Sequence, residues 1–497
     1  MNGESEHLTE LVEVVPPAPA KTPFFQRTDW LSFAIATVLV LMVYLWTLAP
    51  EVGLANSGQY TVGAMYAGVP SPPGFPLWTI YAWLFTKLLP FSNIAWRVAI
   101  SSAVAGALTC GVIALMVSRG GVMVMDGMRG IKRLVPKDEM LLRVVCGCVA
   151  GMGFGFDGAF WPKTVIPDPW PLSLLLFSLV LCQLMRWLSN PERKRYLCAA
   201  CFAYGLTLTN SQFLLAAAIG LQIFVAIGKP SLGRDIFFAD ALMFATGFVA
   251  GHFGFLSELN SYVGFASQLR GMCIWVGIGM AVLCVGLIIA TRSFITEWRA
   301  ILCLGVMFTI GLSLYFYVPI ASMTNPPINW GYPRTVEGFS HVLTRGQYEK
   351  PYPTGNLHRF VEQIQMYGGF AVRDFGLAYL AAALIPFCLL HRMKPVARKW
   401  LLGLLAVYVS TAGLTLVVLN PSNDRASYDL IKAYFTTLHL VLAVCAGCGL
   451  VLAGSFFARL PITGDTRETA ITSPPLSAPV GNCPATGCRA RNRPLES

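Results

Sequence analysis

Apolar runs of about 20 residues recur along this chain of 497 residues, and they restrict its fold more than any other feature. Such a run is long enough to cross a hydrocarbon core of about 30 Å as a helix. Only helices and closed barrels satisfy their backbone polar groups there. Charged residues make up 12% of the chain, against the roughly 25% that is usual in soluble proteins. The sequence therefore predicts an all-α, polytopic membrane protein.

The two ends of the chain differ from the apolar middle. The first 28 residues are polar and Pro-rich, and they lack the apolar core of a cleavable signal peptide. The end of the chain is rich in Thr, Pro and Gly, a composition typical of disorder. We expect three parts: a cytoplasmic segment at 1–28, a transmembrane domain at 29–457 and a disordered tail at 458–497.

Lys and Arg residues indicate which loops face the cytoplasm. The net charge of +11 comes mostly from short loops between apolar runs. This distribution is typical of cytoplasmic loops and argues against a nucleic-acid partner. If the short run at 77–90 crossed the membrane, the basic segment 119–143 would face outward, against the positive-inside rule. We therefore expect 77–90 to lie along the membrane surface.

This assignment predicts about twelve crossings of a cytoplasmic (inner) membrane, with both termini in the cytoplasm. The expected crossings lie near 30–49, 95–117, 144–160, 169–188, 196–209, 212–227, 236–256, 271–290, 300–319, 376–390, 400–419 and 433–457. The expected outward segments are 50–94, 161–168, 257–270, 320–374 and 420–432.

The stretch at 49–77 is the first candidate for an extracytoplasmic site. It carries no Lys or Arg and is dense in Gly, Pro and small polar residues. Its backbone amides would find no partners in hydrocarbon, so the stretch has to fold at a membrane face. We expect it to form one wall of a site together with the other outward segments.

Two acids stand near the mouths of predicted crossings. Asp168 lies between Pro167 and Pro169, which stiffen the backbone around it. It is either a positioned functional carboxylate or a helix-start carboxylate favoured by the helix dipole. Asp157 ends an apolar run, where it is either a functional group or a solvated helix end.

Cations and aromatic residues complete the outward set. Arg suits bidentate binding of phosphate and Lys supplies a point charge, although each one is also explained as a solvated loop charge. An outward Trp can stack on a sugar or anchor the bilayer boundary. His439 and His252 are lone histidines in apolar runs without ligand spacing, so we expect no metal site. The candidate binding residues are Ser57, Arg97, Lys163, Trp330, Arg334, Arg345 and Tyr348.

Several motifs resemble a bacterial membrane-protein family, long labelled a domain of unknown function, whose eukaryotic relative is transmembrane protein 260. The motifs are LANSGQY…AGVPSPPGFPLW, NIAWRVAISSAVAGAL, IPDPWPLSLLLFSL, RYLCAACFAYGLTLTNSQ and NPPINWGYPRTVEGFSHVLTRGQY. The resemblance covers roughly residues 30–390, and it is most specific in the last motif.

The resemblance implies a GT-C architecture, a multi-pass helical bundle with surface-lying helices in its first outward loop. It also implies protein O-mannosyltransferase-like chemistry, in which a sugar moves from a polyprenyl-phosphate carrier to an extracytoplasmic protein or glycan. The implied partners are membrane lipid and lipid-linked sugar. We expect no further cofactor, and the resemblance leaves a divalent metal open.

The chain departs from the family pattern at acidic positions. Asn56 and Gln59 stand where the family reads Asp and Glu in Asp-Ser-Gly-Glu. An acid, Asp168, remains where the family carries Glu, while Ser211 and Tyr332 replace a family His and Asp. An amide cannot act as a general base, which typically contributes about 10²- to 10⁴-fold to a rate.

Three hypotheses follow. In the first, the chain transfers a sugar: Asp168 acts as base or positioning acid, Asn56 and Gln59 orient acceptor or sugar, and Arg334 and Arg345 hold the carrier phosphate. In the second, the chain is an inactive relative that binds lipid-linked sugar or a membrane partner. In the third, it is a transporter, which would need ionisable groups along a path through the membrane.

Overall fold

The computed structural model describes residues 23–128, 134–253, 268–348, 353–422 and 424–458. The chain divides into two units, Met1–Ala458 and Arg459–Ser497. The second unit, with most of the expected tail, lies outside the described residues, as do residues 1–22 and most of the expected outward segment 257–270. Among the described residues, β-type pairing is confined to one bridge between Val69 and Asn329.

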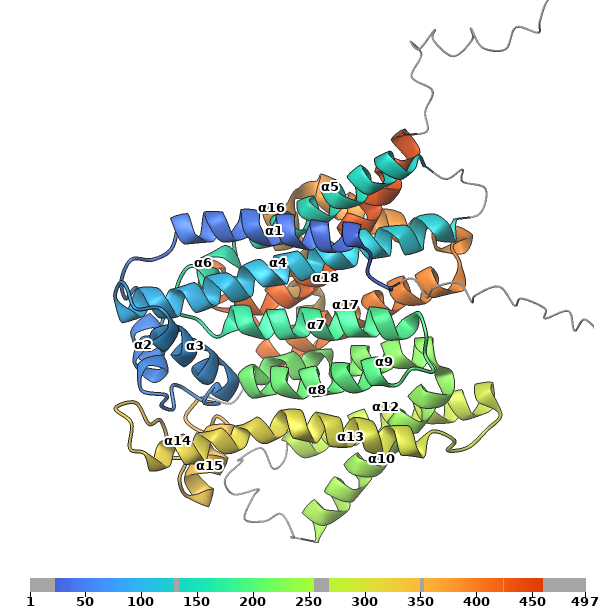
Figure 1. Ribbon diagram of the computed structural model, residues 1–497. Helices are drawn as coiled ribbons and strands as arrows, with labels where there is room; N and C mark the ends of the chain where they lie inside the picture. Colours follow the sequence, from blue (N-terminus) through green and yellow to red (C-terminus); the bar gives the residue numbers. More distant parts are fainter. Residues whose placement is uncertain (1–22, 129–133, 254–267, 349–352, 423, 459–497) are drawn as a thin grey trace, which may run out of the picture. The chain divides into compact units, whose positions relative to one another are not determined.

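Long helices form most of the first unit (Figure 1). They are α1 (Arg27–Trp46), α4 (Ile94–Gly127), α5 (Pro136–Gly155), α7 (Trp170–Leu188), α8 (Arg195–Asn210), α9 (Ala218–Gly228), α10 (Pro230–His252), α12 (Gln268–Thr291), α13 (Trp298–Leu312), α16 (Leu357–Cys388), α17 (Pro395–Leu419) and α18 (Arg425–Phe457).

Short elements connect them: α2 (Ser57–Met65), α3 (Pro76–Leu88), α6 (Trp161–Thr164), η1 (Gln212–Ala217), η2 (Ser313–Phe316), α14 (Tyr317–Met323), α15 (Val336–Leu343) and η3 (Leu390–Arg392). In Figure 1, α2, α3, α14 and α15 gather at one end of the long helices. Parts of two expected outward segments, 50–94 and 320–374, therefore lie at the same end.

Eight helices of the described chain are long and apolar enough to cross a membrane. The all-α, multi-pass membrane character predicted from the sequence is thereby confirmed. Four other expected crossings fall on α5, α8, η1 with α9, and α10, which are not among these eight. The count of about twelve crossings stays a prediction.

The bounds of α4 and α5 differ from those of the expected crossings. α4 continues to Gly127, although the crossing was expected to end near residue 117, and α5 begins at Pro136 rather than near 144. α5 also ends at Gly155, so Asp157 follows the helix rather than lying in its last turn. The expected surface-lying run forms α3, whose 13 residues span about 20 Å, less than a hydrocarbon core.

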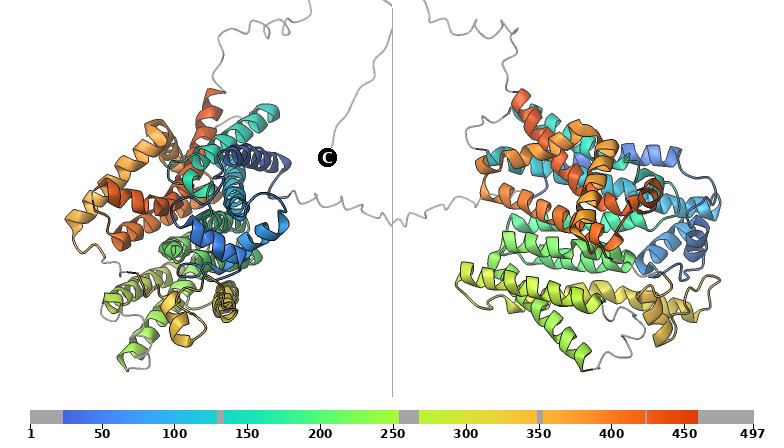
Figure 2. Two further views of the ribbon diagram at one scale, coloured as in Figure 1. Left: turned by 90° about the vertical axis from the view of Figure 1, so that its left-hand side faces the viewer. Right: turned by 180° about the vertical axis from the view of Figure 1, so that it is seen from behind.

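Helix packing joins segments that are distant in sequence. α1, α4 and α5 pack together, and α7 links α4 to α8. Figure 2 shows α18 beside α16 and α17 (orange to red), and α18 also packs against α4 and α5. α8 and α13 approach closely through glycines: a Cβ added to Gly205 would lie 3.1 Å from the Gly311 Cα atom. This packing places the start of α7 against both the first outward loop and α18.

Candidate functional site

Asp168 lies just before α7 with its side chain 7% exposed. Its Oδ1 accepts from Trp170 N at 2.8 Å, and its Oδ2 lies 3.1 Å from Lys163 Nζ. Ser102 of α4 fixes the backbone here, since its hydroxyl donates to the Asp168 carbonyl at 3.0 Å. The Lys163 side chain is 30% exposed. The ion pair therefore has a buried anion and a cation that reaches the surface.

Tyr60 of α2 brings the first outward loop to Asp168. Burial raises the pKa of the Tyr60 hydroxyl well above its usual range, and the nearby Asp168 carboxylate raises it further. Tyr348 and Tyr434 are also close enough to raise it slightly. The Tyr60 ring packs edge-on against Trp78 of α3, with 5.3 Å between the ring centroids. Tyr60 thus packs against α3 and lies near Asp168 at the start of α7.

Gln59 joins α2 to the stretch around Trp330. Its amide oxygen accepts from Trp330 Nε1 at 2.9 Å and from Ser71 N at 2.7 Å. The backbone supports this contact, because Val69 N donates to Ile328 O at 3.0 Å and Trp330 N donates to Val69 O at 3.1 Å. A carboxylate at position 59 would offer the same acceptor. The structure therefore brings two of the predicted site residues into direct contact.

Asn56 and Ser57 differ in how the fold uses them. Asn56 precedes α2 in the left-handed conformation (φ 63°) and its side chain does not cap the helix. It is exposed. Ser57 is buried, and its hydroxyl donates to the Gly53 carbonyl at 2.6 Å. Asn56 is accessible to a ligand, whereas the Ser57 hydroxyl serves the local fold.

Arg345 and Tyr348 lie in the turn that follows α15. The Arg345 guanidinium carbon is 4.8 Å from the centroid of the Tyr348 ring. Gln212 of η1 holds the preceding turn, since its Nε2 donates to the Leu343 carbonyl at 2.8 Å. The predicted cation is therefore half-buried in a braced turn whose aromatic partner is close to Tyr60.

Arg97 and Arg334 bind other partners. The Arg97 guanidinium donates to the carbonyls of Phe91 (2.9 Å), Ser92 (2.8 Å) and Thr86 (3.3 Å), which closes the turn after α3. Arg334 donates to Asn325 Oδ1 at 2.9 Å. These contacts stabilise local loops, and a role in substrate binding stays a prediction for both residues.

Asn210 is a structural centre of the site that sequence reasoning left without a role. Its fully buried amide donates to the Pro169 carbonyl at 2.9 Å and to Ser173 Oγ at 2.7 Å, while its oxygen accepts from Trp78 N at 3.1 Å. It thereby joins the start of α3, the start of α7 and the end of α8. Asn210 lies in one of the family motifs, and this position is the sequence feature that could have indicated its role.

His439, a lone histidine in its apolar run, has a buried partner that is distant in the sequence. His439 Nδ1 lies 2.7 Å from Asp157 Oδ2, and both side chains are at most 1% exposed. Asp374 of α16 joins them, with one potential ligand atom from each residue lying within 4.8 Å of the others. Asp157 is therefore a buried, paired acid rather than a solvated helix end.

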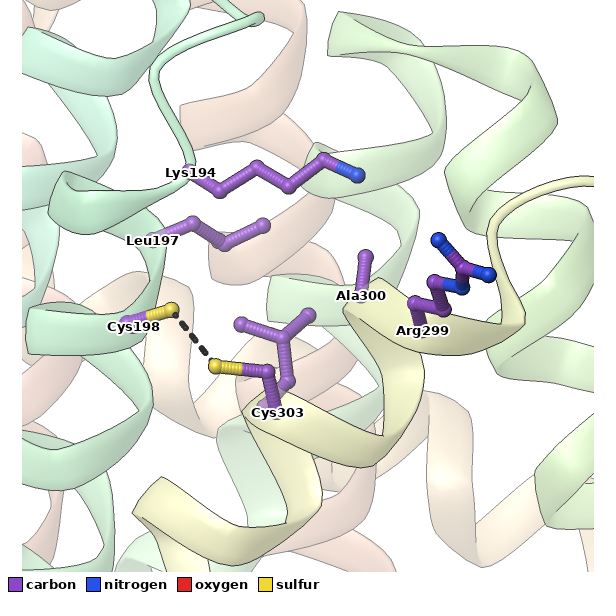
Figure 3. Close-up of a pocket in the computed structure, with 7 residues that line it drawn as sticks. Lys194, Leu197, Cys198, Arg299, Ala300 and Cys303 are labelled. Carbon is purple, nitrogen blue, oxygen red and sulfur yellow. Dashed lines mark hydrogen bonds between the residues drawn. The ribbon is translucent and has the colours of Figure 1, made fainter.

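A cavity of about 140 Å³ lies far from Asp168. Figure 3 shows its lining at the starts of α8 and α13, where Cys198 Sγ and Cys303 Sγ are 3.6 Å apart. Lys194 precedes α8, and Asn210 ends it, which separates the two sites by about 24 Å of helix. This cavity is not part of the candidate site.

Comparisons with known proteins support the resemblance. Residues 56–232 match the family described as the protein O-mannosyl-transferase TMEM260 N-terminal domain. Mouse protein O-mannosyl-transferase TMEM260 is 25% identical over 242 residues, which are 47% of this chain and 32% of the mouse protein. The Dictyostelium discoideum protein O-mannosyl-transferase tmem260 is 30% identical over 69 residues, or 14% of this chain and 8% of that protein.

The chain thus spans about a third of the length of the mouse relative, and less of the other. Among solved structures, ArnT from Cupriavidus metallidurans bound to undecaprenyl phosphate gives a TM-score of 0.43 at 13% identity, covering 85% of this chain and 60% of that chain. The matched region 56–232 contains Asn56, Gln59, Lys163 and Asp168. The family resemblance is confirmed: residues 56–232 of this chain are related to the N-terminal domain of the protein O-mannosyl-transferase TMEM260 family.

Proposed function

We propose that the chain transfers a hexose from a polyprenyl-phosphate carrier to an acceptor on the outer face of the cytoplasmic membrane, with both termini inside. One observation supports this above all: Asp168, Lys163 and Tyr60 converge within the region related to a mannosyltransferase domain. The carrier class is the one that the family resemblance implies. A protein or glycan hydroxyl would be the acceptor.

Lys163 couples binding of the carrier phosphate to release of the Asp168 carboxylate, which then acts as the base. Its ammonium neutralises Asp168 Oδ2 in the structure, 3.1 Å away. A carrier phosphate that engages the exposed ammonium would compete for this charge and leave Oδ2 available to an acceptor hydroxyl. Arg345, half-buried in its turn, would supply a second contact to the phosphate, since guanidinium groups bind phosphate bidentately.

The chemistry then needs one proton acceptor and one stabilised leaving group. The acceptor oxygen attacks the anomeric carbon of the sugar while its proton passes to Asp168. The bond between the anomeric carbon and the phosphate oxygen breaks, and polyprenyl phosphate leaves with its charge held by Lys163. Asn56 and Gln59 would orient sugar or acceptor by hydrogen bonds, because amides cannot take the proton.

A second function, binding of lipid-linked sugar or a membrane partner without turnover, is favoured by the two amides. Gln59 is engaged by Trp330 and Ser71, and Asn56 has lost the charge that the family carries. The double variant Asn56→Asp with Gln59→Glu separates the two. Transfer that appears only in this variant would identify the natural chain as a disabled enzyme. The transporter hypothesis has no comparable support.

The direct test uses the full chain in lipid nanodiscs with polyprenyl-phosphate mannose and other polyprenyl-phosphate hexoses. Asp168→Asn keeps the shape of the side chain and removes its basicity, so we expect turnover to fall by about 10²- to 10⁴-fold. Glu337→Gln, on the exposed face of α15, is the matched control and should leave turnover unchanged. Full turnover in Asp168→Asn would remove this residue from the mechanism.

A further inference from the structure

The cluster of Asp157, His439 and Asp374 lies outside the machinery proposed for sugar transfer. Three elements supply it: the segment after α5, the middle of α18, and α16 just before its kink at Gly376 (φ 76°). Asp157 and His439 are sealed from solvent, and Asp374 is half-buried. Together they offer two carboxylates and one imidazole, with one potential ligand atom from each residue lying within 4.8 Å of the others.

The contacts within the cluster define where a cation would bind. Asp157 Oδ1 accepts from Ala159 N at 3.1 Å, while Oδ2 shares a proton with His439 Nδ1 across 2.7 Å. The rings of Phe375 and Tyr367 flank His439, with centroids 4.8 and 6.4 Å away. These neighbours hold the imidazole in one orientation.

We propose that this cluster is a binding site for a divalent transition metal, with Zn²⁺ as the ion that its mixed imidazole and carboxylate donors suit best. The ion would displace the proton shared by His439 Nδ1 and Asp157 Oδ2, and that proton would leave to solvent. Asp374 is the third ligand. The two paired atoms separate on binding, because ligands about 2.0–2.1 Å from Zn²⁺ in a tetrahedral site lie farther apart than 2.7 Å.

The site is adjacent to the candidate transfer centre but distinct from it. Trp170, two residues after Asp168, donates through Nε1 to Thr436 Oγ1 at 2.7 Å. His439 follows Thr436 by three residues on α18, or about 4.5 Å along the helix axis. A bound metal would therefore fix α18 and α16 to the start of the 157–168 segment, while Lys163 and Asp168 occupy its other end.

The experiment measures Zn²⁺ bound to the full chain, purified without a polyhistidine tag, stripped with a chelator and dialysed against ZnCl₂ alone. We expect one Zn²⁺ per chain by elemental analysis. His439→Gln and Asp374→Asn should each weaken binding by at least the roughly 10- to 100-fold that loss of a supporting contact costs in other sites. His391→Gln, an exposed histidine beside α16, is the matched control and should bind one Zn²⁺.

Two further measurements keep the result decisive. If His439→Gln does not fold, Asp374→Asn and the visible absorption of Co²⁺ bound to the wild-type chain report on the site. Asp168→Asn should retain Zn²⁺ whether or not the chain transfers sugar, which separates this proposal from the proposed function. A wild-type chain that retains no stoichiometric Zn²⁺, or ligand variants that bind it like wild type, would overturn the proposal.

Discussion

The short segment 157–168 contributes an aspartate near each end to a pair with a basic side chain, and the two pairs differ in their access to solvent. In the Lys163–Asp168 pair the lysine side chain is 30% exposed, whereas the Asp157 and His439 side chains are 0% and 1% exposed. A substrate can reach and disrupt the first pair but not the second. The segment thus combines a pair suited to exchange partners during a reaction with one suited to hold helices in place.

The buried Asp157–His439 pair (the sealed pair) should show the largest effect of a single substitution, and that effect should be on stability. Asp157→Ala leaves His439 buried without its partner, and breaking a buried pair typically costs about 3–5 kcal/mol. We expect a large drop in the melting temperature of the detergent-solubilised chain. Asp168→Ala, next to the exposed lysine, should lower it much less. Equal losses in the two variants would break the comparison.

A substitution in the partly exposed Lys163–Asp168 pair (the open pair) should instead affect binding of the lipid-linked donor. Lys163→Met removes the ammonium and keeps the aliphatic stem, and a hydrogen bond to a charged group contributes about 1.5–3 kcal/mol. We expect KM for polyprenyl-phosphate sugar to rise by about 10- to 100-fold. Lys87→Met, at the end of α3, provides a lysine control. A loss of kcat with unchanged KM would contradict phosphate binding by Lys163.

The contact between Gln59 and Trp330 is a smaller test of the same site. Gln59→Ala removes the acceptor for Trp330 Nε1 and Ser71 N, which should cost about 1–3 kcal/mol of stability. Gln59→Glu restores an acceptor in the same position and should recover most of that loss. If Gln59→Ala and Gln59→Glu destabilise the chain equally, the amide oxygen is not the bridge between α2 and the Trp330 stretch.

The sequence singled out all four residues of the two pairs but could not predict that they would pair. The distribution of Lys and Arg favoured a surface-lying run at 77–90 and placed 161–168 on the same side of the membrane as the first outward loop. Local motifs singled out Asp168, Gln59 and Trp330, and Lys163 was singled out as an outward cation. The Asp157–His439 contact joins residues 282 positions apart, and no local spacing connects them. Helix packing alone brings that pair together.

A third ion pair, at the opposite helix ends, should give the smallest effect. Glu297 lies 2.6 Å from Lys194 and 2.7 Å from Lys229. The hydrogen bond from Lys194 and then that from Lys229 lower the pKa of Glu297 below its usual value of 4.5. Lys194 is 42% exposed, so screening limits the pair to less than about 1 kcal/mol.

The sign of its pH dependence follows from that lowered pKa. The folded chain holds Glu297 ionised more strongly than the unfolded chain does, so the stabilisation is complete well above pH 4.5 and is lost as the pH falls through the folded pKa. Glu297→Gln should therefore melt slightly lower than wild type at pH 7, and the difference should vanish in acid. A difference in melting temperature that persists below the folded pKa of Glu297 would mean that its side chain contributes packing rather than charge, unlike either pair on the 157–168 segment.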